Sequence, residues 1–120
     1  YFNINTMNTL EHPNSFELAR VKYSVAEVDY ISGENLGIAN GNSCTIQLAL
    51  HTQRSPVPKD KRINTFYHEL VHQMLFAIDF DDLTKDEKFV TGMGNMLHEF
   101  DLTRDVVPVK VEDKFESKGD

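Results

Sequence analysis

Apolar and polar residues alternate with a period of two in the first half of the chain and recur at helical spacing in the second half. Residues 21–30 carry valine and tyrosine at alternating positions, which predicts a β-strand. Residues 45–50 repeat the pattern, with Ile46, Leu48 and Leu50 on one face, and predict a second strand. Two turn signals containing Asn and Gly separate these predicted strands.

A helical repeat replaces the alternation after Pro58, because a proline disfavours helix in the residue before it. Apolar residues recur at spacings of three and four over residues 61–78. This pattern predicts a long helix, with Asp60 as its N-cap. The apolar residues cover most of the helix circumference, so we expect this helix to lie near the centre of the fold.

An acidic turn over residues 79–83 separates this helix from a second one. Thr84 and Glu87 have the Thr-x-x-Glu form of a capping box and predict a helix that extends to about Phe100. The second predicted helix contains two glycines, and each glycine lowers helix stability by about 1 kcal/mol relative to alanine. We interpret Gly92 and Gly94 as places where the second helix crosses closely over the first. A short or kinked second helix is the alternative.

Together these elements predict an α+β fold, in which a small antiparallel or mixed sheet packs on a central helix and a second helix. The length of 120 residues fits one domain over residues 1–120. The two ends, residues 1–14 and 112–120, are largely polar or charged, and we expect them to be loosely ordered.

The chain carries 12 Lys and Arg residues against 19 Asp and Glu residues, a formal net charge of −7. This balance argues against nucleic acid or an anionic membrane as the main partner, because few basic groups are available to neutralise phosphates. Cys44 is the single cysteine, which excludes an intramolecular disulfide and a multi-cysteine zinc ribbon. Without a long apolar run or a visible signal peptide, we expect a cytoplasmic protein.

The segment His68-Glu69-Leu70-Val71-His72 matches the pattern His-Glu-x-x-His inside the predicted central helix. Its two histidines lie about 40° apart around the helix and about 6 Å apart along it, so both imidazoles can reach one zinc ion. Glu69 projects beside the metal position, where a carboxylate can take a proton from metal-bound water. Hydrogen-bonded core histidines are the alternative, but burying these three polar side chains for packing alone is costly.

A catalytic zinc ion usually has three protein ligands and one open position. The second helix offers Glu87 as the favoured third ligand, with Asp86 as the fallback, although Glu87 can instead serve the capping box. His98 shares a helix face with Glu87 but lies about 16 Å from it along the axis, so the two cannot bind one metal. The acidic turn adds further candidates that can equally be surface charges: Asp79, Asp81 and Asp82.

The motif, followed by Asp86-Glu87-Lys88-Phe89-Val90 and an apolar stretch to Leu97, resembles the small gluzincin-type zincins of phages and mobile elements. The nearest group is the ImmA/IrrE-like metallopeptidases. The resemblance covers about residues 45–100 and is strong at His-Glu-x-x-His alone. It implies a strand before the active-site helix, zinc bound by His68, His72 and Glu87, and Glu69 as the general base.

The sequence also departs from this family. Val71 stands where a glycine is common before the second histidine, and the 120 residues show no helix-turn-helix. The DNA-binding repressors that the family is known to cleave are therefore not implied as substrates. The SprT-like group fits less well, because its members usually carry a cysteine zinc ribbon.

The expected activity is hydrolysis of a peptide bond in a protein or peptide substrate, with Zn²⁺ as cofactor. Zinc would lower the pKa of its water to about 7, and Glu69 would pass the proton to the leaving amine. If residues 45–50 form a sheet edge beside the site, they can hold the substrate by β-augmentation. The candidates for stabilising the oxyanion are Tyr30, Tyr67 and His51.

Two other functions compete with this expectation. The first is a zinc-binding interaction module without catalysis, which a fourth protein ligand would support. The second is a metal-free binding protein of a phage or mobile element, in which the motif is accidental. The metal content of the purified protein separates the second function from the others.

Overall fold

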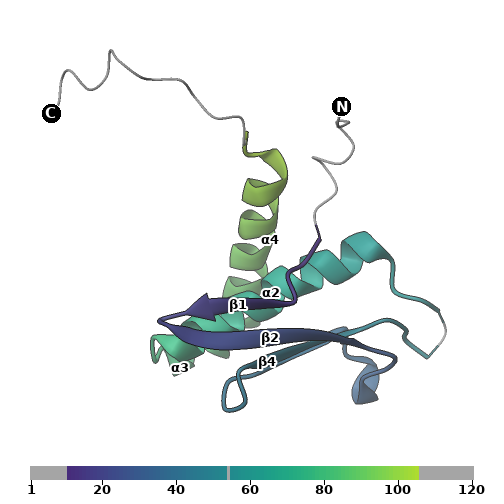
Figure 1. Cartoon of the computed structure of the whole chain (residues 1–120), viewed down its shortest axis with the longest axis horizontal. Helices are drawn as coiled ribbons and strands as arrows, with labels where there is room; N and C mark the ends of the chain where they lie inside the picture. The colour runs from purple at the N-terminus through teal and green to yellow at the C-terminus, as the bar shows by residue number, and fades with distance from the viewer. Residues whose placement is uncertain (1–10, 54, 106–120) are drawn as a thin grey trace, which may run out of the picture.

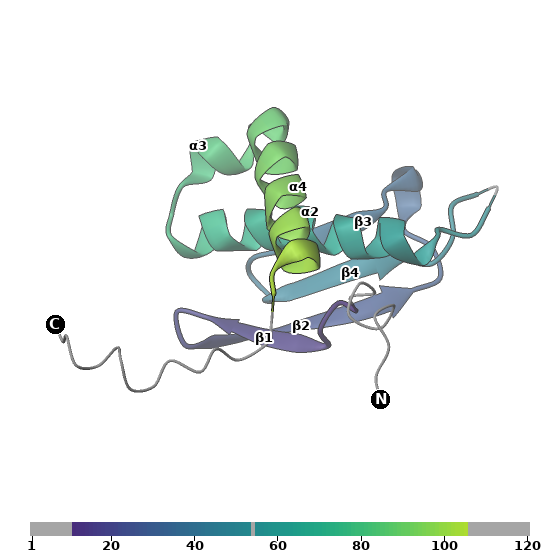
Figure 2. The same ribbon diagram turned by 90° about the horizontal axis from the view of Figure 1, so that it is seen from above.

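The computed structural model describes residues 11–53 and 55–105. In this part of the chain the elements are β1 (Ser15–Leu18), β2 (Val21–Val28), the 3-10 turn η1 (Ser32–Glu34), β3 (Gly37–Asn40), β4 (Thr45–Ala49), α2 (Lys59–Ala77), α3 (Asp81–Thr84) and α4 (Glu87–Thr103). α2 lies along one face of the sheet, and α4 crosses α2 (Figure 1, Figure 2). This arrangement confirms the α+β class.

The sheet is mixed, with strand order β1-β2-β4-β3. β1 and β3 pair antiparallel with their neighbours, whereas β2 and β4 run parallel to each other. The two predicted strands are confirmed as β2 and β4, each ending slightly earlier than predicted. β4 is an internal strand, so the condition under which residues 45–50 could hold a substrate at a sheet edge is not met. The edge next to β4 is β3.

The alternation pattern does not reveal β3, because this strand is four residues long and begins with a glycine. Pairing with β4 and contact with α2 hold it in place. A Cβ added at Gly37 would lie 2.7 Å from Thr65 Cγ2 and 3.1 Å from Glu69 Cγ. The missing side chain of Gly37 therefore lets the edge strand approach α2 beside Glu69.

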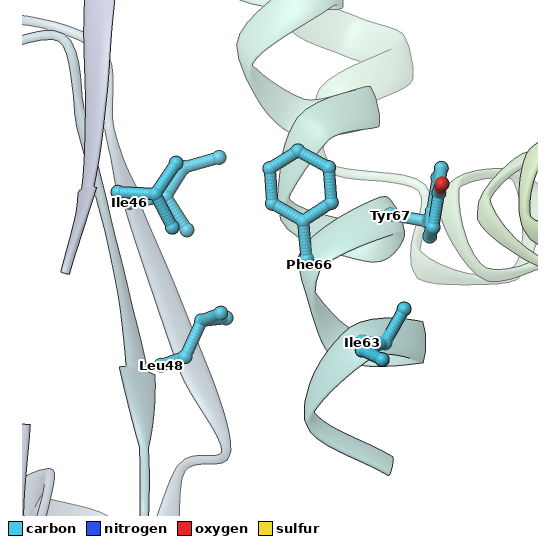
Figure 3. Close-up of a cluster of buried hydrophobic side chains, with 6 residues drawn as sticks. Ile46, Leu48, Ile63, Phe66 and Tyr67 are labelled. Atoms are coloured by element: carbon cyan, nitrogen blue, oxygen red, sulfur yellow. The ribbon is translucent and has the colours of Figure 1, made fainter. Parts of the chain in front are cut away.

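The core lies between β4 and the apolar face of α2. Ile46 and Leu48 of β4 are fully buried and face Ile63 and Phe66 of α2 (Figure 3). Burial of one such side chain stabilises a fold by about 1.5–3 kcal/mol. These contacts place α2 at the centre of the fold, as its periodicity predicts.

The start of α2 differs from the prediction in one detail. The helix begins at Lys59, and Pro58 occupies the N-cap position with extended backbone angles. Asp60 lies in the first helical turn, so its assignment as the N-cap was wrong. Its negative charge there is favourable near the positive end of the helix dipole.

α4 packs closely against α2 at Gly94. A Cβ added at Gly94 would lie 3.0 Å from the Cα atom of His68, whereas nothing lies within 4 Å of the same position at Gly92. The predicted role in a close crossing is confirmed for Gly94 and wrong for Gly92. Further along α4, His98 stacks on Tyr67 of α2 with ring centroids 5.0 Å apart, and Tyr67 points toward α4 in Figure 3.

The chain between α2 and α4 forms the short helix α3 as well as the predicted turn. α4 begins at Glu87, and its N-cap is Asp86, whose Oδ1 accepts a hydrogen bond from the Phe89 amide at 3.1 Å. Thr84 ends α3 and does not cap α4. The predicted capping box of Thr84 and Glu87 was therefore wrong.

Residues 11–14 fall within the segment predicted to be loosely ordered, yet they contact the sheet. The carbonyl of Asn14 accepts a hydrogen bond from the Val25 amide at 2.9 Å, and His12 Nε2 lies 2.9 Å from Glu27 Oε2. Residues 1–10 and 112–120 lie outside the described residues. Among the helices of the described part, none has the length and apolarity needed to cross a membrane.

Candidate metal centre

The two histidines of the motif lie in the middle of α2 and face α4. The ring centroids of His68 and His72 are 5.1 Å apart. Glu87, the first residue of α4, reaches both rings: its Oε1 lies 3.1 Å from His68 Nε2, and its Oε2 lies 3.3 Å from His72 Nε2. One donor atom from each of the three residues lies within 4.8 Å of the other two. The three predicted ligands therefore lie together.

Thr84 orients one of the two imidazoles. Its Oγ1 lies 2.9 Å from His72 Nδ1, so it can accept the proton of that nitrogen and leave the lone pair on Nε2. A hydrogen bond of this kind fixes the tautomer and the ring orientation of a metal-ligating histidine. The sequence reasoning missed this role, because the contact depends on how α3 folds back over α2 rather than on a local motif.

The remaining candidate ligands do not belong to the group formed by His68, His72 and Glu87. The carboxylate of Asp86 is engaged at the start of α4 by the Phe89 amide. His98 contacts Asn64 through Nδ1 at 3.0 Å, in the half of α4 remote from Glu87. Three described residues of the α2–α4 connection do not belong to the three-residue group: Asp79, Asp81 and Asp82.

Glu69 lies next to the ligand group but on the side of α2 that faces β3. Its side chain is buried, with the whole residue 8% exposed. Burial, and secondly the negative charge of Glu87, raise the pKa of Glu69 to about 7, while a backbone hydrogen bond from Ala39 acts in the opposite direction. A carboxyl group that titrates near neutrality can both accept and return a proton. The site therefore places a group suited to acid–base chemistry beside the three ligands.

The donor set fits a zinc ion. Two imidazole nitrogens and a carboxylate oxygen are ligands that zinc accepts, and three protein ligands are the number typical of catalytic sites. Burial lowers the pKa of His72, with His68 acting in the same direction and Glu87 opposing it. Burial thus favours the neutral imidazole, which is the form that binds metal.

The three candidates for oxyanion stabilisation have other contacts. Tyr67 donates its hydroxyl to Asp101 of α4. Tyr30 donates to Glu34 Oε2 at 3.0 Å, and His51 forms an isolated bridge with Pro56. None of these contacts directs a donor at the ligand group.

Comparisons with known proteins identify no relative of this chain. No protein-family model matches it, no curated protein matches it, and no solved structure matches its fold. A functional proposal therefore depends on the geometry and chemistry of the site itself.

Proposed function

We propose that this chain is a zinc-dependent metallopeptidase with a minimal zincin-like fold, similar to the ImmA/IrrE-like metallopeptidases. The observation that carries the proposal is the convergence of His68, His72 and Glu87, with donor atoms within 4.8 Å of one another, beside the buried Glu69. Three ligands alone would suit many metal proteins. A buried carboxyl group next to them, with a pKa raised to about 7, favours hydrolysis over simple metal storage.

Each residue then has a distinct role. His68 and His72 would hold zinc through their Nε2 atoms, and Glu87 through a carboxylate oxygen. When bound, zinc supplies a Lewis acid that acidifies water and polarises the substrate carbonyl. Glu69 takes up the proton of the attacking water and delivers it to the leaving amine. Thr84 keeps the His72 ring in place through Nδ1.

Within residues 11–53 and 55–105, β3 is an edge strand of the sheet, which supports binding of an extended peptide beside the site. The Leu36 carbonyl accepts a hydrogen bond from the Ala49 amide at 2.9 Å, which fixes the positions in β3 that bond to β4. Because these positions alternate, Gly37 and Ala39 direct their backbone polar groups away from β4, where the Ala39 amide donates a hydrogen bond to Glu69. A substrate can add to this edge by β-augmentation through the Gly37 amide and carbonyl and the Ala39 carbonyl. The role expected for residues 45–50 is therefore proposed for β3 instead.

Metal analysis of the full chain, combined with a peptide-cleavage assay, tests the proposal. We expect about one zinc ion per chain, lost when His68 and His72 are both changed to Ala. Glu69→Gln should keep the zinc and lower the cleavage rate by about 10²–10⁴-fold, because the amide cannot accept the proton.

The other results separate the competing functions. A purified chain that binds no zinc would favour the metal-free binding protein of a phage or mobile element. A chain that binds zinc but cleaves no peptide would favour the non-catalytic interaction module. Equal cleavage by the wild type and Glu69→Gln would remove Glu69 from the mechanism.

A further inference from the structure

Two cavities meet at Glu69, one toward each end of the motif. The first, about 310 Å³ in volume, is lined by Lys61, Asn64 and Glu34 as well as Glu69, and is called here the polar cavity. The second, about 300 Å³, is lined by Ala39, Gly41 and Phe76 together with Glu69, His72, Gln73 and Thr84, and is called the apolar cavity because most of its accessible lining is carbon. Volumes near 300 Å³ lie at the small end of the range for ligand pockets. Each cavity is therefore large enough to accept one side chain of a bound peptide.

The apolar cavity owes its character to one aromatic ring. Phe76 lies on α2 one turn beyond His72, and its ring packs against the turn between β3 and β4. A Cβ added at Gly41 would lie 2.5 Å from Phe76 Cδ2, so the glycine allows this contact. Phe76 remains 45% exposed, which leaves part of its carbon surface open to a ligand.

The polar cavity has the opposite chemistry. It presents the ammonium group of Lys61, the amide of Asn64 and the carboxylate of Glu34. Glu34 is already engaged by the Tyr30 hydroxyl at 3.0 Å and the Gln53 amide at 3.1 Å. A polar side chain placed here can form hydrogen bonds or an ion pair with these residues, which an apolar side chain cannot.

β3 links the two cavities, because Gly37 lines the polar cavity and Ala39 lines the apolar one. These two residues share the face of β3 that is directed toward α2, and they lie about 6.6 Å apart along the strand. Side chains directly opposite each other on paired strands lie on the same face. A peptide paired with β3 therefore presents two side chains, two residues apart, to the cavities on either side of Glu69.

Resting on the proposed peptidase function, we infer that the site selects an extended peptide with an apolar side chain beside Phe76 and a polar side chain two residues away, beside Lys61. Glu69 lies between the two positions, so the bond to be cleaved lies between the two selected side chains.

Sequencing of cleavage products tests this inference. The zinc-loaded full chain is incubated with synthetic peptides of randomised sequence, and the products are sequenced by mass spectrometry. We expect apolar residues at one fixed distance from the cut and polar residues two positions away, across the cut. Phe76→Asn should reduce the apolar preference roughly 10-fold, while the polar preference and the zinc content stay unchanged. The matched control is Phe80→Asn, since Phe80 is 53% exposed and lines neither cavity.

The outcomes separate this inference from the proposed function. Cleavage without an apolar preference, or a preference that survives Phe76→Asn, overturns the inference and leaves the peptidase proposal intact. If no peptide is cleaved, the peptidase proposal fails, and the inference is decided by the peptides that the immobilised zinc-loaded chain retains. Peptides retained by the wild type must carry an apolar and a polar residue two positions apart. Peptides retained by Phe76→Asn must lack the apolar enrichment. Retention without this enrichment, or no retention, overturns the inference too.

Discussion

The central helix α2 and the junction between α3 and α4 supply parts of the same candidate site, but they are held in different ways. In α2 the two histidines are brought together by one helical turn, and the opposite face of the helix is anchored in the core. In the junction three neighbouring residues have three separate tasks. Thr84 contacts His72, Asp86 caps α4, and Glu87 reaches both histidines. Local geometry preforms the histidine pair, whereas the carboxylate ligand depends on tertiary contacts.

The exposure of the three side chains shows the same contrast. The side chain of Glu87 is 65% exposed, against 26% for His68 and 19% for His72. Fewer neighbours therefore restrain the carboxylate than restrain the imidazoles. We expect conservative substitutions at the junction to change zinc affinity, even where the core of the fold is untouched.

The largest effect at the junction is expected for Glu87→Gln. This change removes the anionic oxygens that face both imidazoles, and we expect zinc affinity to fall more than about 100-fold, beyond the usual effect of an outer-shell partner. Asp86→Asn is the matched control, because asparagine caps helices about as well as aspartate. Competition with a chromophoric chelator measures both affinities. Native affinity in Glu87→Gln would move the ligand role to Asp86 or to an aspartate of the connection.

The different roles of Thr84 and Asp86 show how much of the local structure could be predicted from the sequence. Both residue types are good N-caps, and Thr-x-x-Glu also fits a capping box, so local preference favoured Thr84. In the fold, Thr84 lies opposite His72 and Asp86 serves as the cap. A local pattern cannot distinguish these possibilities, because the deciding partner comes from another helix.

The same reasoning explains which elements the sequence revealed. α2, β2 and β4 bury one face against the core, and this burial leaves a periodic pattern of apolar residues. β3 is four residues long and contributes few apolar side chains, so it leaves no such pattern. The histidine pair was predictable from helix geometry. Glu87 was proposed from its place on the second helix, and its contact with the histidines depends on the crossing at Gly94.

A somewhat smaller effect is expected for Thr84, the residue that joins the two regions. Thr84→Val keeps the shape of the side chain but removes the acceptor for His72 Nδ1, and zinc affinity should fall by about 10- to 100-fold. Thr84→Ser retains the hydroxyl and should recover most of this affinity. If both variants lose affinity equally, packing rather than the hydrogen bond explains the role of Thr84. Zinc titration and thermal unfolding of both variants distinguish the two cases.

The crossing of the helices can be tested with the two glycines of α4. Gly94→Ala forces a Cβ to 3.0 Å from the His68 backbone, so α4 must move away, with an expected loss of about 1–3 kcal/mol in the free energy of unfolding. Gly92→Ala has free space and should instead stabilise α4 by about 0.5–1 kcal/mol.

Zinc affinity gives the second measurement for these glycine variants. It should fall for Gly94→Ala, because the shift of α4 carries Glu87 away from the histidines, and stay native for Gly92→Ala. Equal zinc affinities in the two variants would show that the crossing distance does not position Glu87.

A pH dependence of stability belongs to α2 rather than to the junction. Burial raises the pKa of Glu69 to about 7 in the folded chain, from an ordinary value of 4.5. Between these values the folded state holds a proton that the unfolded state has released, so the free energy of unfolding falls as pH rises through this window. The lowered pKa of His72 acts in the opposite sense, since its contribution to stability is lost as pH falls. The wild type alone therefore does not isolate Glu69.

Comparison with Glu69→Gln removes the contribution of His72, which both proteins share. In metal-free protein, the free energy of unfolding of the wild type should fall relative to Glu69→Gln by about 2–3 kcal/mol between pH 5 and pH 8. Urea unfolding at the two pH values measures this difference. Added zinc should reduce it, because a nearby cation favours the ionised carboxylate and lowers its pKa. A difference that is independent of pH would show that Glu69 does not titrate near neutrality in the folded chain.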